Sequence, residues 1–146
     1  MNSCIASRRR TDESFRLASN LRSRLTIAMR NNIKSGSAIR DLGCSIESFK
    51  HYIEELWLSG MTWGNYGSHW VLDHIVPVIA FDLTNRREFL MATNYRNIQP
   101  MWSRDNAQKN DKLDWTHEVY KTPKDTLPIL QNLSFDLYNS VMHEKD

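Results

Sequence analysis

The stretch "WVLDHIVP", residues 70–77, places an acidic residue and a histidine side by side inside an otherwise apolar run. Its aromatic and β-branched residues favour a β-strand, and Pro77 favours an early end to that strand. An ionised carboxylate such as that of Asp73 is costly to bury unless it is paired or holds a metal ion. Asp73 and His74 therefore need partners, and residues 94–111, "NYRNIQPMWSRDNAQKND", contain a second polar cluster.

The two clusters together contain the groups for one metal ion and one base. Asp73 supplies a carboxylate oxygen and Asn106 a neutral amide oxygen, and both suit Mg²⁺. His74, beside the ion, can take a proton from water near neutral pH. Adjacent residues on a regular strand point to opposite faces, so either the backbone is irregular at this pair or the ion lies at the edge of the strand. Both alternatives are compatible with the sequence.

Four segments in order carry a resemblance to a known family. The segments "DHIVP", "NIQPMW" and "DNAQKND" resemble the HNH endonucleases in their His-Asn-Asn variant. The preceding "LGCSIESFKHYIEELWLSGMTWGNYGSHW" is similar to the segment that leads into this motif in small phage-encoded HNH endonucleases, which include free-standing homing endonucleases and relatives of recombination endonuclease VII. The resemblance covers roughly residues 20–112. It implies a ββα-metal (His-Me finger) core with a first strand at residues 71–75, a second strand after Pro77, and a helix from Ser103.

The resemblance also implies a role for each motif residue. Asp73 matches the first metal ligand, and His74 matches the general base. Asn97 matches the asparagine that ties down the loop and so orients His74. Asn106 matches the second metal ligand, and Lys109 matches a basic residue of the helix that lies near phosphate. The implied reaction is hydrolysis of DNA phosphodiester bonds with one divalent ion, Mg²⁺ or Mn²⁺, giving 5′-phosphate and 3′-hydroxyl ends.

The cysteines depart from one branch of that family. Many HNH proteins bind a structural zinc through paired cysteines, whereas this chain has only Cys4 and Cys44. No structural zinc is therefore expected, and packing of Trp70, Met101 and Trp102 is expected to hold the loop. This departure favours the homing-type relatives over endonuclease VII.

The charge of the chain is unevenly distributed. The net charge is +2 over 146 residues, but residues 1–40 carry nine basic and two acidic side chains, whereas residues 41–146 carry ten basic and fifteen acidic ones. A basic first quarter favours an anionic partner, with double-stranded DNA as the leading candidate, although a solvated helix face gives the same pattern. The side chains expected to contact DNA are Arg8, Arg9, Arg10, Arg22, Arg24, Arg30, Lys34 and Arg104.

Helical periodicity organises the rest of the chain. We expect a helix from about residue 12 to residues 34–36, a helical turn before Gly43, and a helix from Ile46 to Gly60 with Ser45 as its N-cap. A helical piece at residues 87–91 and one or two short helices after residue 114 are also expected. The expected organisation is a basic helical DNA-binding module at 1–60, the nuclease core at 61–113, and a helical extension at 114–146 that packs on the core.

The side chains around the motif have less specific interpretations. Trp63 and Tyr66 are expected to pack in a loop, with stacking on a base as the alternative. His69 is a candidate substrate contact or a loop histidine. No apolar run reaches the roughly 20 residues of a membrane helix and no signal-peptide region is evident, so a cytoplasmic location is expected, in the host cytoplasm if a phage encodes the chain.

The sequence thus predicts an α+β fold and a metal-dependent DNA endonuclease, of the phage-encoded nicking or homing type. A monomer would nick one strand, and a homodimer could cut both. The alternative from another class is a non-catalytic DNA-binding protein that uses the ββα unit as a scaffold. An RNA nuclease remains a third interpretation, because the hydrolysis chemistry does not identify the sugar.

Overall fold

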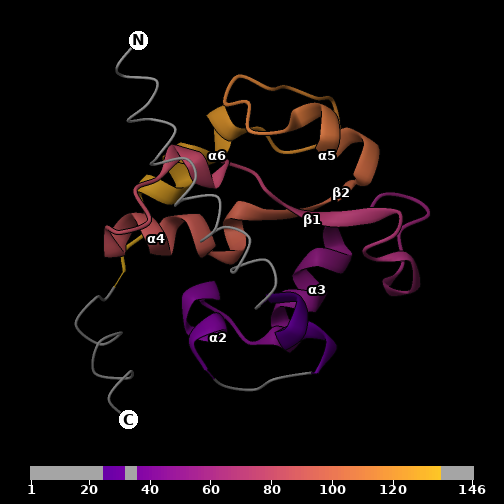
Figure 1. Cartoon of the computed structure of the whole chain (residues 1–146), viewed down its shortest axis with the longest axis horizontal. Coiled ribbons are helices and arrows are strands. Elements are labelled where there is room, and N and C mark those ends of the chain that lie inside the picture. The colour runs from indigo at the N-terminus through magenta and orange to yellow at the C-terminus, as the bar shows by residue number, and fades with distance from the viewer. Residues whose placement is uncertain (1–24, 32–35, 136–146) are drawn as a thin grey trace.

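The computed structural model describes residues 25–31 and 36–135, and these residues combine helices with one two-stranded antiparallel sheet (Figure 1). The predicted mixture of α and β elements is confirmed. The predicted DNA contacts Arg8, Arg9, Arg10, Arg22, Arg24 and Lys34 lie outside the described residues, as do Cys4 and most of the expected first helix, of which residues 25–30 are described as helical.

The sheet joins two segments that are far apart in the sequence. Strand β1 (Trp70–His74) pairs with β2 (Ile98–Trp102), with Trp70 opposite Trp102 and His74 opposite Ile98. Helix α5 (Ser103–Lys109) follows β2 directly and packs against both strands. The expected helix start at Ser103 is confirmed.

The prediction of a second strand directly after Pro77 is wrong. The chain there forms a 3-10 turn, η2 (Val78–Ala80), closed by a hydrogen bond from the Ala80 N–H to the Pro77 carbonyl at 2.9 Å. Helix α4 (Arg86–Thr93) and a second turn, η3 (Tyr95–Asn97), follow before β2 begins. The true second strand contains Pro100, which is tolerated because a strand of a two-stranded sheet needs its N–H groups on only one side.

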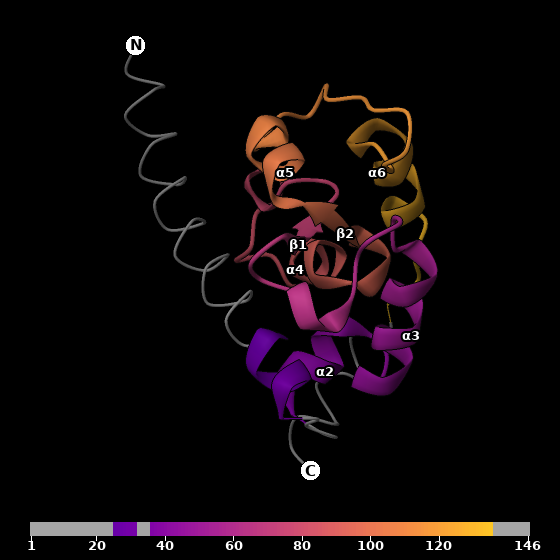
Figure 2. The same cartoon turned by 90° about the vertical axis from the view of Figure 1, so that its right-hand side faces the viewer.

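Helices lie on both sides of the sheet (Figures 1 and 2). Helices α2 (Ser37–Leu42) and α3 (Ile46–Leu56) lie on one side, and α5 and α6 (Pro123–Gln131) lie on the other. Gly43, with φ 84°, ends α2 as expected, and the Ser48 N–H donates to the Ser45 hydroxyl at 3.1 Å, so the predicted N-cap of α3 is confirmed. None of the helices among the described residues is long and apolar enough to cross a membrane.

Helix α3 ends four residues earlier than the sequence predicted. The expected end was Gly60, whereas Trp57 already has extended backbone angles (φ −57°, ψ 136°) and its N–H bonds to the Glu54 carbonyl in a tighter turn. The Trp57 ring makes edge contacts with Trp63 and Trp70 at centroid distances of 5.2 and 6.0 Å. The aromatic packing therefore competes with continuation of the helix.

Two apolar clusters hold these elements in place. The larger one joins the helix at 25–30, α2 and α3 to the lower face of the sheet, with Phe49, Ile53 and Trp70 fully buried at its centre. It takes residues from both sides of the predicted boundary at residue 60, so the helices and the strands share one core. The smaller cluster joins α4 and α6 behind the end of β1 through Val76, Phe81, Leu83, Met91, Ala92 and Leu130.

Candidate functional site

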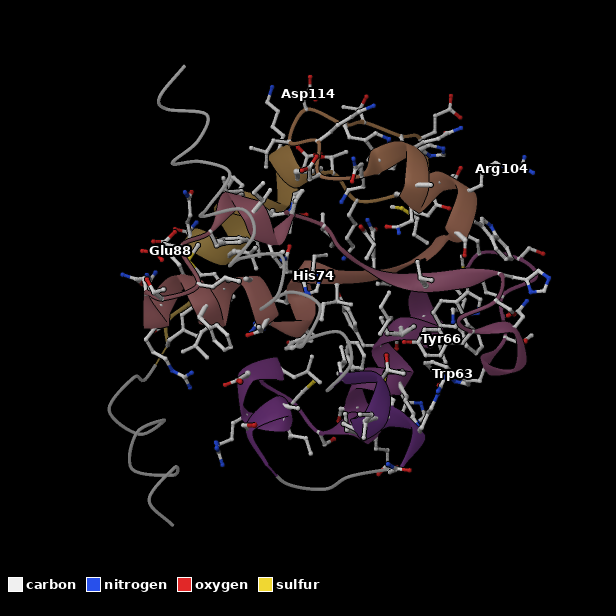
Figure 3. The ribbon with its side chains drawn as sticks, viewed as in Figure 1. Trp63, Tyr66, His74, Glu88, Arg104 and Asp114 are labelled. Carbon is white, nitrogen blue, oxygen red and sulfur yellow. The ribbon has the colours of Figure 1, made fainter. Side chains whose placement is uncertain are left out.

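His74, the last residue of β1, lies near the middle of the molecule (Figure 3). His74 is 6% exposed, and it lines a pocket of about 230 Å³ together with Asn106 of α5 and Arg30 of the helix at 25–30. The pocket thus brings together three predicted site residues that are far apart in the sequence. No acidic side chain is among the described residues that line it.

The pocket runs along the edge of β1. Its walls include Val71 from one face of the strand and both Leu72 and His74 from the other face. Because successive strand residues point to opposite faces, a pocket lined by both sets must wrap around the strand's edge. The pairing of Asp73 with Gln99 and of His74 with Ile98 is regular, so the irregular backbone that the sequence left open as one alternative is not observed, and an ion at the edge of the strand stays a prediction.

Asn97 fixes the chain immediately after His74. Its residue is fully buried, and its side-chain oxygen accepts a hydrogen bond from the Val76 N–H at 2.8 Å. Its amide nitrogen donates to the carbonyls of Val76 at 3.1 Å and Ala92 at 3.0 Å. The Ile75 N–H also donates to the Asn97 carbonyl at 2.8 Å. These bonds hold the backbone of Ile75 and Val76, the two residues that follow His74, and an effect on the orientation of His74 stays a prediction.

Asp73 points to the opposite side of the strand from His74. Its two carboxylate oxygens lie 3.1 and 3.0 Å from the Lys109 ammonium, and the Gln99 amide donates to it at 3.3 Å. Lys109 also donates to the main-chain carbonyl of His74 at 2.9 Å. Asp73 is 3% exposed and Lys109 is 0% exposed, so this ion pair is buried.

Lys109 was predicted to lie near phosphate, and the structure places its side chain in the interior against Asp73. Lys109 is the last residue of α5, and its side chain turns inward. This position is favourable because a buried Asp73 carboxylate is costly without a compensating positive charge. Arg104, the second residue of α5, was expected to contact DNA, and its side chain is exposed (Figure 3). Arg30 is exposed as well.

The two predicted ligands have oxygen donors of the type that a hard divalent cation takes, but Asn106 lines the pocket whereas Asp73 does not and is paired with Lys109. Lys109 touches Asp73, and Asn106 lies three residues earlier on the same helix, so both predicted ligands belong to the side of β1 that α5 covers. A carboxylate and an amide oxygen are ligands that Mg²⁺ and Mn²⁺ accept, with water and substrate oxygens completing the shell. Within residues 25–31 and 36–135 no group of three or more His, Cys, Asp or Glu side chains could hold an ion.

Asp41 is a buried residue near the site that the sequence did not single out. Its residue is 6% exposed, its carboxylate lies 3.3 Å from Arg86, and it lines a cavity of about 30 Å³ that His74 also lines. Its position in a short polar helix, "SAIRDLG", is typical of a solvated aspartate, and nothing local in the sequence distinguishes it. The cavity is a product of tertiary packing.

Packing and hydrogen bonds hold the residues next to the candidate site. Trp70 and Met101 are fully buried, and the Trp70 indole donates to the Thr62 carbonyl at 2.7 Å. Cys44 is a half-buried free thiol, and burial raises its pKa to about 11 against a smaller lowering effect of Arg96. His69 is exposed, with its Nδ1 2.9 Å from the Ser68 hydroxyl.

Comparison with known proteins identifies viral relatives. "Uncharacterized protein L426" of Acanthamoeba polyphaga mimivirus is 37% identical over 103 residues, which are 70% of this chain and 45% of that protein. "Uncharacterized protein L246" of the same virus is 24% identical over 108 residues, 74% of this chain and 47% of that protein. The chain thus spans about half the length of the curated relatives it matches. No family model and no solved structure matches the chain.

Proposed function

We propose that this protein is a metal-dependent DNA endonuclease of the HNH type, built on a ββα-metal core. The observation that carries the proposal is that β1 and α5 deliver His74 and Asn106 to one pocket at the edge of β1. The clamp that Asn97 makes on Val76, directly beyond His74, and the exposed Arg30 on the same pocket support it. The names of the viral relatives state no activity, so these relatives do not bear on the reaction.

The chemistry assigned to the pocket is hydrolysis of a backbone phosphodiester. His74 accepts the proton of a water molecule as the water oxygen attacks phosphorus. The bond from phosphorus to the 3′ oxygen breaks, the 3′ oxygen takes a proton from solvent, and the products carry 5′-phosphate and 3′-hydroxyl ends. Asn97 limits the reorientation of His74 by holding the backbone of residues 75 and 76.

Asp73 and Asn106 are the residues proposed to hold one Mg²⁺ or Mn²⁺ ion. When bound, such an ion supplies charge stabilisation for the phosphate oxygens. The Lys109 ammonium holds the Asp73 carboxylate in place at 3.0 Å. Lys109 is therefore assigned a positioning role through Asp73, and no contact with the substrate.

A supercoiled-plasmid assay in Mg²⁺, Mn²⁺ and EDTA tests the proposal. We expect metal-dependent conversion to open circles by a monomer, or to linear DNA if a homodimer cuts both strands. His74→Ala should lower the rate roughly 100-fold or more, the usual scale for a general base. His51→Ala is the matched control, since His51 is an exposed histidine on α3 whose imidazole lies 3.3 Å from Glu54.

Three outcomes separate the alternatives. Equal cleavage by the parent and His74→Ala would reject the assigned base. A gel shift of DNA without cleavage by any variant, on a substrate library as well as on plasmid, would favour a DNA-binding scaffold. A parallel assay with single-stranded and duplex RNA identifies an RNA nuclease if RNA alone is cut.

A further inference from the structure

The pocket that His74 lines also contains groups that suit a phosphate. Thr26 and Arg30 are four residues apart on one helix, so their side chains share a face, and both line the pocket. Tyr66 lines it from the loop before β1, and its hydroxyl lies 3.2 Å from the Thr26 hydroxyl. An arginine beside two hydroxyls offers several donors to phosphate oxygens.

Packing of the Tyr66 ring against its aromatic neighbours holds the Tyr66 hydroxyl in place. The ring lies against Trp70 at a centroid distance of 4.7 Å and against Trp63 at 6.0 Å, and Figure 3 shows Trp63 and Tyr66 close together beside the strand. Trp70 is fully buried, and its indole donates to Thr62 and Asn65. The aromatic cluster therefore fixes the Tyr66 hydroxyl, and through Thr26 it fixes the helix that carries Arg30.

We propose that Arg30, Thr26 and Tyr66 form a phosphate subsite that holds a backbone phosphate of the DNA strand next to the phosphate at His74 and Asn106. All five of these residues line the same pocket, so the two phosphates would be neighbours on one strand. This inference rests on the proposed function, because it takes the strand to be the substrate. It assigns Tyr66 to packing through its ring and to substrate positioning through its hydroxyl.

Fluorescence anisotropy with a labelled duplex oligonucleotide in EDTA tests the subsite without turnover. Arg30→Gln should weaken binding roughly tenfold and lower the dependence of log K on log salt by about one unit. Tyr66→Phe should weaken binding about threefold with an unchanged salt slope, since no charge is lost. Arg40→Gln is the matched control, because Arg40 is an exposed helical arginine of α2 that does not line the pocket.

Equal losses for Arg30→Gln and Arg40→Gln would overturn the subsite, since both would then act through general charge. Inorganic phosphate at matched ionic strength is the second probe. We expect inorganic phosphate to compete poorly with the oligonucleotide. If low millimolar phosphate displaced the oligonucleotide from the parent protein but not from Arg30→Gln, the site would bind small anions, and the assignment to a DNA strand would be overturned. Because binding is measured without metal, loss of cleavage and loss of the subsite are separate results.

Discussion

Replacing Lys109 with methionine separates the two roles that the sequence and the structure give this residue. Methionine keeps the length and much of the volume of the side chain and removes its charge. If Lys109 contacted phosphate at the surface, the protein would remain about as stable and would bind DNA less well. If it neutralises Asp73 in the interior, the protein should lose stability.

The structure sets the magnitude of that loss. Lys109→Met removes two contacts to the Asp73 carboxylate, at 3.0 and 3.1 Å, and one hydrogen bond to the His74 carbonyl at 2.9 Å. The neutral Gln99 amide, at 3.3 Å, does not replace that positive charge, and Asp73 is 3% exposed. Breaking a buried ion pair from one side costs about 3–5 kcal/mol, which corresponds to a fall in the melting temperature of roughly 10 °C.

Urea and thermal unfolding measure the loss, with Lys112→Met as the control because Lys112 is an exposed lysine three residues further on. The double variant Asp73→Asn, Lys109→Met should recover much of the stability, since it leaves no unpaired buried charge. A difference of less than about 0.5 kcal/mol between Lys109→Met and Lys112→Met would refute the buried ion pair. A loss of the same size in the double variant would place the cost in packing.

Three further variants test other parts of the structure. Asn97→Asp should cost about 3 kcal/mol in urea unfolding, because an oxygen would replace the amide that donates to Val76 and Ala92; an unchanged midpoint would contradict the clamp. Tyr120→Phe should cost about 1–2 kcal/mol in the same assay, because the Tyr120 hydroxyl donates to Asp105 at 2.7 Å and accepts from the Trp102 N–H. Because its pKa is raised to about 11, Cys44 is only roughly 0.3% thiolate at pH 8.5. In a Cys4→Ser background, iodoacetamide should therefore react roughly 100-fold more slowly with the native protein than with the urea-unfolded protein. Because burial favours the neutral thiol, the stability that it contributes is present below the ordinary pKa of 9.0 and is lost as the pH rises toward 11.

Local chemistry in the sequence was sufficient to predict several element boundaries. Ser45 caps α3 through its own hydroxyl, and Gly43 ends α2 with a positive φ that glycine adopts readily. The strand around Asp73 and the helix that starts at Ser103 were also predicted near their observed bounds. Each of these signals depends on residues a few positions apart.

The features that the sequence missed depend on distant contacts. Strand β2 contains Pro100, which lowers the strand signal, and it forms because its residues pair with β1 almost 30 positions earlier. Helix α3 stops at Leu56 because Trp57 packs with Trp63 and Trp70. A helix pattern read along the chain contains none of this information.

In the candidate site too, the sequence could not predict features that depend on distant contacts. Two motif residues, His74 and Asn106, line one pocket together with Arg30, which was expected from the charge pattern, but the motif gave no direction to the side chains of Asp73 and Lys109. Spacing along α5 places Lys109 on the face of Asn106, and only the packing of α5 on β1 turns that face toward a buried carboxylate.

The regular register of β1 and the proposed chemistry place opposite demands on the Asp73–His74 pair, and our proposal reconciles them by placing the site at the edge of the strand. Alternation sends Asp73 toward α5 and His74 toward the helix at 25–30, so one face of the sheet cannot serve a ligand and a base together. A pocket that wraps the edge is open to α5 on one side and to His74 on the other, and its lining by Val71, Leu72, His74 and Asn106 has that form. Lys109 makes two contacts that a surface lysine could not make. Its ammonium group holds the Asp73 carboxylate on the α5 side and donates a hydrogen bond to the main-chain carbonyl of His74. One buried cation thereby ties the expected ligand to the expected base, which is why we expect its removal to disturb both stability and the site.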